Sequence, residues 1–225
     1  MISSAQYLGI EESHLVGIAS GHRLTPDAAA AFIQMQQAAA AEGIDIAIAS
    51  SHRSFDRQSA IWQAKWQGQR AVLDIHQQAV DMQALSDEQK LFAILLYSAI
   101  PGGSRHHWGT DLDVYDAGAC AERGHALQLV ASEYHDNGPC AAMSLWLEQH
   151  AHTFGFYRPY AEFHGAIAAE PWHLSYQPQA REISDNFEVE QLVSLLRTQD
   201  VAGNSAILAH IDDIFYRYIL NKVRL

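Results

Sequence analysis

The chain contains little cysteine, which limits the ways in which its fold can be held together. Only Cys120 and Cys140 occur in 225 residues, and their separation is not that of a zinc knuckle. We expect two free, buried thiols of the kind found in ordinary protein cores, and the sequence leaves open whether they pair.

Positive charge and long apolar runs are also scarce. The chain has 14 Lys and Arg against 26 Asp and Glu, a formal net charge of −12, and this excess repels phosphate backbones and anionic lipids. Neither a nucleic acid nor a membrane surface is therefore an expected partner, and no segment approaches the roughly 18 to 20 apolar residues of a membrane span. Residues 1–17 lack the basic and apolar regions of a signal peptide. We expect a cytoplasmic protein if Met1 is the natural start, and a periplasmic one if it is not.

The chain does contain enough apolar material for one core. Hydrophobic residues make up 48% of it and charged residues 18%, as in ordinary globular proteins, and single cores extend to about 250 residues. We expect residues 1–225 to form a single domain. The candidate site motifs fall within about residues 44–177, and C-terminal helices are expected over about 187–222.

Local patterns predict an α+β fold in which helices flank a small antiparallel sheet. Thr25 and Pro26 mark the start of a helix that Gly43 ends, and alternating Ile46 and Ile48 predict a half-buried strand. The pattern of residues 69–84 favours helix over strand, and residues 116–139 are expected to form a long loop that walls or covers the site. Further helices are expected over 54–67, 86–100, 141–153, 187–198 and 205–220, and further strands over 111–115, 127–130 and 154–160.

Two short stretches, Ser104–Asp113 and Glu170–Tyr176, have the composition of a catalytic site. Together they offer two imidazoles and one carboxylate, from His106, His173 and Asp113, as ligands for Zn²⁺. Three such ligands leave a fourth position for water, which is the arrangement of hydrolytic zinc sites. A hydrogen-bonded His–Asp pair without a metal is the plainer interpretation of one such stretch taken alone. It accounts less well for the occurrence of both stretches in one chain.

Glu170 is the candidate base that takes the proton from water and returns it to the departing amine. Pro171 argues against a helix interior, and a regular strand would send positions three apart to opposite faces. Glu170 and His173 must therefore converge through a bend.

Three sequence blocks occur in the order of a known peptidase family. They are Ser50-x-x-Arg53-Ser54 with Gln58, then Ser104-x-His106-x-x-Gly109-x-x-x-Asp113, and then Glu170-x-Trp172-His173. Over about residues 45–177 the chain resembles the D-alanyl-D-alanine carboxypeptidases of the VanY type. These enzymes belong to a wider group of zinc peptidases that includes lysostaphin-like enzymes and resembles the hedgehog fold, so the resemblance implies a hedgehog- or DD-peptidase-like form of the α+β fold.

The resemblance also implies a role for each block. The zinc ligands would be His106, Asp113 and His173, with Glu170 as general base and acid. The end of the substrate that carries the carbonyl oxygen or terminal carboxylate would be held by Arg53, Ser104 and Gln58, because a guanidinium recognises a carboxylate through paired hydrogen bonds.

Some residues near the blocks have no settled role. Asp111 stands where the family usually has a small residue, and the sequence leaves open whether it accepts a hydrogen bond from a ligand histidine or points to solvent. His107 adjoins the predicted ligand, but the motif spacing selects His106. The aromatic residues expected to form pocket walls and core are Trp108, Trp172 and Tyr176. The sequence leaves open whether Tyr157 and Tyr160 reach the site.

These observations predict hydrolysis of the terminal peptide bond of a peptidoglycan stem peptide or muropeptide, with release of D-Ala. Alternatives on the same scaffold are an L,D-carboxypeptidase, a dipeptidase or a peptidoglycan endopeptidase. A non-catalytic, hedgehog-like zinc binding module is less expected because Glu170 is present. The sequence indicates neither a preference for D- or L-residues nor an oligomeric state.

Overall fold

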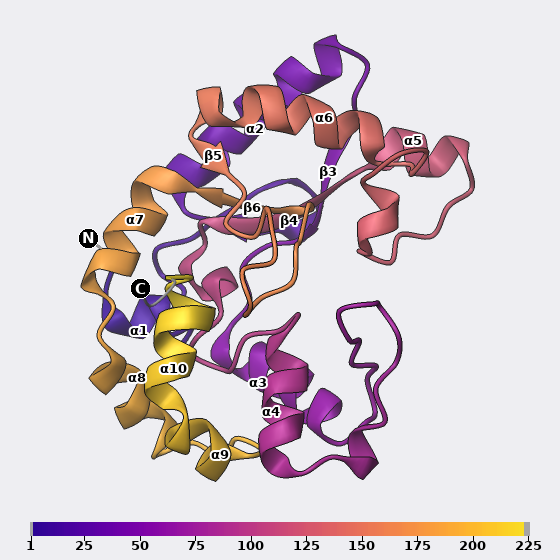
Figure 1. Ribbon diagram of the computed structural model, residues 1–225. Helices are drawn as coiled ribbons and strands as arrows, with labels where there is room; N and C mark the ends of the chain where they lie inside the picture. Colours follow the sequence, from indigo (N-terminus) through magenta and orange to yellow (C-terminus); the bar gives the residue numbers. More distant parts are fainter. Residues whose placement is uncertain (1, 223–225) are drawn as a thin grey trace.

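A four-stranded antiparallel sheet in the order β3-β4-β6-β5 runs through the middle of the computed structural model, which describes residues 2–222 (Figure 1). Its strands are β3 Ile46–Ser50, β4 Asp111–Asp116, β6 His173–Tyr176 and β5 Phe156–Tyr157. A second, two-stranded sheet joins β1 Val16–Gly17 to β2 Arg23–Leu24.

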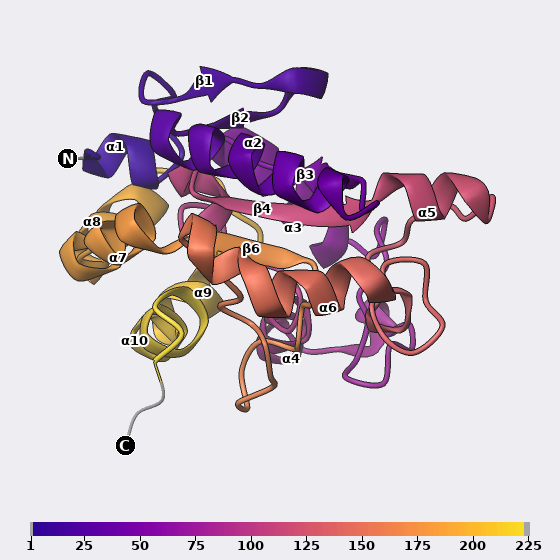
Figure 2. The ribbon, with the colours of Figure 1, turned by 90° about the horizontal axis from the view of Figure 1, so that it is seen from above.

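Two helices cover one face of the larger sheet. The helix α2 (Pro26–Ala41) begins at Thr25, whose side chain accepts a hydrogen bond from the N–H of Ala28, as the capping pattern predicts. The helix α6 (Ala141–His150) lies alongside the sheet with it (Figure 2). The core between these helices and the strands includes Phe32, Met35, Ile46, Leu112, Val114, Met143, Leu147 and Leu174.

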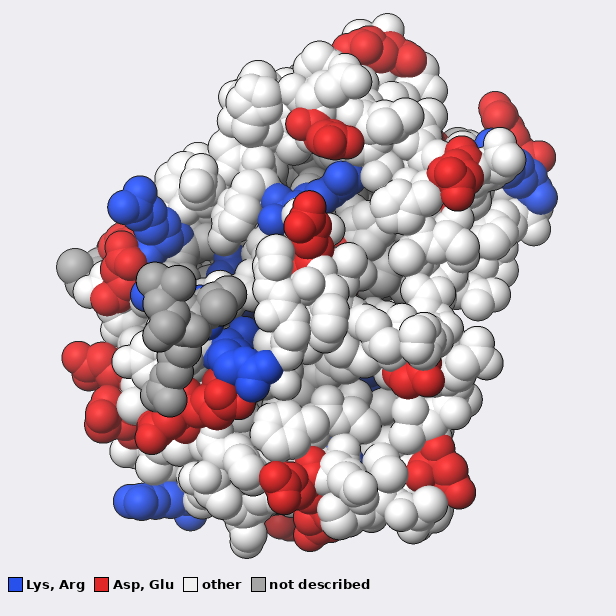
Figure 3. Space-filling model, viewed as in Figure 1, with Lys and Arg blue, Asp and Glu red and all other residues white. Residues whose placement is uncertain are grey.

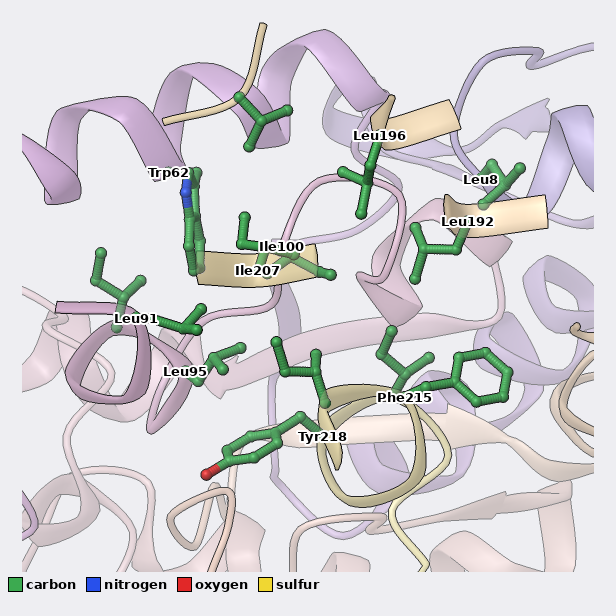
Figure 4. Close-up of a cluster of buried hydrophobic side chains, with 14 of the residues drawn as sticks. Leu8, Trp62, Leu91, Leu95, Ile100, Leu192, Leu196, Ile207, Phe215 and Tyr218 are labelled. Carbon is green, nitrogen blue, oxygen red and sulfur yellow. The ribbon is translucent and has the colours of Figure 1, made fainter. Parts of the chain in front are cut away.

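A second core lies among the helices below the sheet in Figure 1. It is formed by α3 (Phe55–Trp66), α4 (Asp87–Leu95), α8 (Val189–Leu196), α9 (Asn204–Ala209), α10 (Ile211–Ile214) and the π-helical turn η6 (Phe215–Ile219). Figure 4 shows side chains from α3, α4, α8, α9 and η6 converging, among them Trp62, Leu91, Leu95, Leu192, Leu196, Ile207, Phe215 and Tyr218.

Short elements join these layers. They are α1 (Ser4–Tyr7), η1 (Ala19–Gly21), η2 (Met82–Ala84), η3 (Arg105–Trp108), α5 (Ala117–Glu122), η4 (Ala131–Glu133), η5 (Ala151–Phe154) and α7 (Gln177–Asn186). None of the helices within residues 2–222 has the length and apolar character needed to span a bilayer.

The predicted α+β class with a small antiparallel sheet flanked by helices is confirmed, but several elements differ from expectation. The stretch 69–84 was expected to be helical and is mostly a turn-rich loop, because the Asp74 carboxylate accepts hydrogen bonds from the N–H groups of His76 and Gln78. The strand expected over 127–130 is absent. There the Glu133 carboxylate accepts hydrogen bonds from the N–H groups of Gln128 and Val130, which in a sheet would donate to a neighbouring strand.

One predicted helix ends early, a second is divided, and three helices were not foreseen. The helix expected over 86–100 ends at Leu95, and the one expected over 205–220 divides into α9, α10 and η6 at His210, whose φ is −113°. The unforeseen helices are α1, α5, which lies in the stretch expected to be a loop, and α7, in which Ala180 and Ile183 alone are buried.

Candidate metal and substrate site

A cavity of about 490 Å³ lies between the open face of the sheet and the helices of the second core. Part of its wall comes from residues 128–130, so the long segment after β4 walls the site as expected. Six of the seven predicted site residues line this cavity, namely Arg53, Ser104, His106, Asp113, Glu170 and His173. The seventh, Gln58, is buried behind Arg53.

The strand register places Asp113 and His173 directly opposite each other on β4 and β6. Ser50 of β3 pairs with Asp113 from the other side, next to a register shift in β3. Because side chains alternate along a strand, Leu112 and Val114 enter the sheet–helix core while Asp113 lies on the cavity side. The strand predicted over 111–115 therefore separates core side chains from those of the cavity.

The short helix η3 delivers His106 to the same point. It ends at Gly109, whose φ of 73° lies in the left-handed region that favours glycine. A Cβ on Gly109 would also lie 2.3 Å from Cδ2 of Leu15. The family motif thus needs a glycine here, both for the backbone conformation and for the close packing.

Backbone and carboxylate acceptors fix which nitrogen of each histidine faces the cluster. Nδ1 of His106 lies 2.9 Å from the carbonyl oxygen of Ser51, so Nδ1 carries the proton and Nε2 faces Asp113 with a lone pair. Nε2 of His173 lies 3.0 Å from Oδ1 of Asp111, so Nδ1 faces Asp113 in the same way. Both imidazoles are therefore set as neutral ligands.

The donor set fits a metal ion. The ligand atoms of His106, Asp113 and His173 all lie within 4.8 Å of one another and all three residues are buried. Nε2 of His106 is 3.4 Å from Asp113 Oδ2, and Nδ1 of His173 is 3.1 Å from Asp113 Oδ1. Oδ1 of Asp113 is nevertheless a buried atom without a hydrogen-bond partner among the described residues. Such an orphaned oxygen beside two free lone pairs suits a cation.

The electrostatics of the cluster also favour positive charge. Burial alone would raise the pKa of Asp113, but His106 and His173 hold it well below its ordinary value. Burial alone would lower the pKa of His173, yet its hydrogen bond to Asp111 and the negative charge of Asp113 raise it to about 9. In the metal-free chain a proton is therefore stabilised where a metal ion would bind.

A buried network supports His173 from behind. Oδ1 of Asp111 accepts hydrogen bonds from His173 and from Nε of Arg105 at 2.8 Å, and Oδ2 accepts them from Thr110 at 2.7 Å and Ser175 at 3.0 Å. Despite its burial, Asp111 has a pKa below the ordinary value, because Arg105 and His173 stabilise the carboxylate. Asp111 is thus a hydrogen-bond acceptor for His173, a predicted metal ligand, and does not point to solvent.

Glu170 reaches the cluster through a turn that precedes β6. The N–H of His173 bonds to the carbonyl of Glu170 at 3.1 Å, and Oε2 of Glu170 lies 3.6 Å from Nδ1 of His173. The bend expected from Pro171 is therefore present. Burial raises the pKa of Glu170 to about 7, although His173 opposes this rise. Tyr160 packs on the other side, with its ring 4.9 Å from that of His173.

Arg53 lines the cavity and forms no ion pair within residues 2–222, although the charges of Asp113 and Glu170 act on it from a greater distance. Its Nη1 donates to Oε1 of Gln58 at 3.1 Å, and Gln58 is fixed in turn by donating to the carbonyl of Ala99 at 2.7 Å. Nε of Arg53 is buried without a hydrogen-bond partner. Gln58 therefore orients the guanidinium, and Arg53 retains unfilled donors toward the cavity.

The remaining residues singled out in the sequence divide between packing and the site. His107 is buried and joins two backbone segments, because it donates from Nδ1 to the carbonyl of Arg53 and accepts at Nε2 from the N–H of Gly102. Cys120 and Cys140 are free, with their sulfur atoms 4.0 Å apart. The cavity walls include Trp172 and Tyr160, while Trp108 and Tyr176 lie in the two cores and Tyr157 contacts Arg105.

Three features of the site were not foreseen. Arg105 was overlooked because its partners Asp111 and Ser175 come from different strands. Lys65 and Tyr218 also line the cavity, but in the sequence they read as ordinary positions of amphipathic helices. No local signal distinguishes them.

One cavity thus holds a His–Asp–His cluster, the buried carboxyl group of Glu170 and the guanidinium of Arg53. This combination is typical of metal-dependent peptidases. The sequence comparison agrees, because residues 21–179 match VanY, D-alanyl-D-alanine carboxypeptidase. The chain belongs to this family. The family predicted from the three motif blocks is thereby confirmed, and with it the assignment of the chain to the metallopeptidases.

Individual proteins of known sequence or structure are also similar to this chain. An uncharacterized protein of Haemophilus influenzae is 33% identical over 123 residues, which are 54% of this chain and 93% of the relative. The D,D-pentapeptidase VanY from a VanB-type vancomycin resistance cassette, solved with Zn(II), has a TM-score of 0.55 at 22% identity, over 92% of this chain and 93% of that one. The LD-carboxypeptidase LdcB has a TM-score of 0.53 at 25% identity, over 78% of this chain and 74% of its own. These likenesses establish the shared fold.

Proposed function

We propose that this VanY-family chain uses zinc to hydrolyse the terminal peptide bond of a peptidoglycan stem peptide, releasing D-Ala from peptides that end in D-Ala-D-Ala. The observation that carries the proposal is the convergence, in one cavity, of a buried His–Asp–His cluster, Glu170 and an arginine that forms no ion pair within residues 2–222. The family match supports the reaction, and the Zn(II) bound by the VanY structure supports the choice of metal.

In this proposal His106, Asp113 and His173 hold the metal. Zinc, when bound there, acidifies water and polarises the substrate carbonyl. Glu170 lies beside His173 and accepts a proton from the attacking water, then gives it to the amine nitrogen as the C–N bond breaks. A pKa near 7 suits a group that must do both.

The free end of the substrate is assigned to Arg53. Its unfilled N–H groups can form the paired, charge-assisted hydrogen bonds that a terminal carboxylate accepts. Gln58 acts by orienting the guanidinium, and Ser104 lines the cavity near the same end. Recognition of a free carboxylate is what makes the enzyme a carboxypeptidase and not an endopeptidase.

The test compares a short stem peptide ending in D-Ala-D-Ala with the same peptide amidated at its C-terminus. Mass spectrometry should show loss of one alanine from the free acid and little cleavage of the amide, with activity lost on chelation and restored by zinc. A third peptide that ends in L-Ala measures the stereochemical preference. Activity that survives complete metal removal, or equal cleavage of the amidated peptide, would contradict the proposal.

A further inference from the structure

Basic side chains are concentrated in the cavity of a strongly acidic protein. Of 14 Lys and Arg residues, four line this cavity without an ion-pair partner among residues 2–222: Arg53, Arg57, Lys65 and Arg70. The proposed function uses Arg53 alone. Figure 3 shows acidic side chains spread over many parts of one face of the molecule, so its outer surface does not attract an anionic peptide. The positive charges that line the cavity oppose the negative potential of the outer surface.

Lys65 is the most confined of the three cations that the proposed function does not use, since Arg57 and Arg70 are exposed. It projects from α3 and is partly buried, and its Nζ donates to the hydroxyl of Ser98 at 2.5 Å. An ammonium group has three donors, so one hydroxyl leaves most of its capacity unused. Burial, followed by the nearby positive charge of Arg70, lowers the pKa of Lys65 to about 8. The chain therefore holds a charged amine in a place that disfavours the charge.

Arg70 and Arg53 add to this unfavourable arrangement, because both repel Lys65. Glu170 is the acidic group that attracts Lys65, but Glu170 is already assigned to proton transfer and lies beside His173. Like charges that share a wall without a counter-ion are stabilised when an anion binds between them. The wall is thus better suited to a bound anion than to an empty cavity.

We propose that Lys65 and Arg70, with Arg57 nearby, form a second carboxylate-binding subsite that holds an acidic group of the peptide other than the terminal carboxylate bound by Arg53. The inference rests on the proposed peptidase function, because it assigns the ligand as part of the same substrate. It predicts that the enzyme selects acidic peptides over neutral ones of the same length, although the protein as a whole is acidic.

The test measures binding with three pairs of peptides. In each pair one residue carries either a side-chain carboxylate or the matching amide, at the last, the penultimate or the third-from-last position. Calorimetry uses the zinc-loaded Glu170→Gln chain, so that affinity is measured without turnover. At one of the positions the acid form should bind roughly tenfold tighter than the amide, the usual scale for a hydrogen bond between charged groups.

The double variant Lys65→Met/Arg70→Gln in the same background should bring that ratio close to one. Arg70→Gln alone, a change at an exposed residue, should lower the ratio partially and guards against misfolding of the double variant. The matched control is Arg181→Gln, which removes a charge from a side chain that is 80% exposed and should leave the ratio unchanged.

Three results would overturn the inference. These are a ratio near one at all positions before the wall is changed, a ratio that survives the double variant, and failure of both forms to bind. Hydrolysis of the free and amidated peptides by the unmodified enzyme is followed separately. The hydrolysis assay thus tests the proposed peptidase function, and the acid-to-amide binding ratios test the second subsite independently of it.

Discussion

Nε2 of His173 lies 3.0 Å from Oδ1 of Asp111, on the opposite side of the ring from the nitrogen that faces Asp113. The sequence left Asp111 open between this arrangement and exposure to solvent. A carboxylate on the far nitrogen fixes the tautomer of a ligand histidine and raises its basicity. The strand parity that Asp111 shares with Asp113 thus gives one histidine a carboxylate on each side.

Asp111→Asn should weaken zinc binding by about 10- to 100-fold, because the amide keeps the shape of the carboxylate but loses its charge. Competition with a chromophoric chelator measures the affinity directly. The control is Asp185→Asn, at a side chain that is 63% exposed. An affinity equal to that of the unmodified chain would show that the carboxylate does not support His173.

Arg105→Met should destabilise the metal-free chain by about 3 to 5 kcal/mol, because it leaves the buried Asp111 carboxylate without its charge partner. Asp111→Ala in the same chain should recover a large part of this loss, since the orphaned charge is then gone. Urea unfolding measures each free energy. Strictly additive effects of the two changes would contradict the coupling.

The elements that could be predicted from sequence are those whose determinants are local. The helix predicted from residue 86 begins at a capping box of Ser86 and Gln89, with both of its hydrogen bonds, and Thr25 caps its helix as predicted. The alternation along β4 also predicted that Leu112 and Asp113 have separate surroundings, one in a core and one in the cavity. In each case neighbouring residues carry the information.

The features that could not be predicted depend on distant residues. The Arg105 side chain is held by Asp111 and by Ser175, 70 positions away. The strand expected over 127–130 is absent because Glu133 satisfies its backbone. Nothing in the sequence indicates that Lys65 lines the cavity, because its place depends on how α3 packs against distant parts of the chain.

Arg53→Lys should raise KM for peptides with a free C-terminus by roughly tenfold or more, because an ammonium cannot form the paired hydrogen bonds of a guanidinium. Peptides with an amidated C-terminus should be hydrolysed equally poorly by both enzymes. Steady-state kinetics with the two peptides provides the comparison. An equal loss on both peptides would assign Arg53 to the carbonyl oxygen instead of the terminal carboxylate.

The preference for acidic peptides should weaken as pH rises through about 8. Burial and the charges of Arg70 and Arg53 lower the pKa of Lys65 to that value, opposed by Glu170, and Ser98 is its hydroxyl partner. The ammonium is therefore charged below pH 8 and loses its proton above it. Acid-to-amide binding ratios at pH 7 and pH 9 test this, and Lys65→Arg should keep the ratio constant. A ratio that does not change in the unmodified protein would exclude Lys65 as its source.

The most direct test of the account measures zinc content and turnover on the same preparations of the unmodified chain and of Glu170→Gln. Because Glu170 lies beside the His–Asp–His cluster and is proposed to carry a proton and not to bind the metal, both proteins should hold one zinc ion per chain. Release of D-Ala by the variant should fall by about 10² to 10⁴. Equal turnover by the two proteins, or loss of zinc from the variant, would contradict the account.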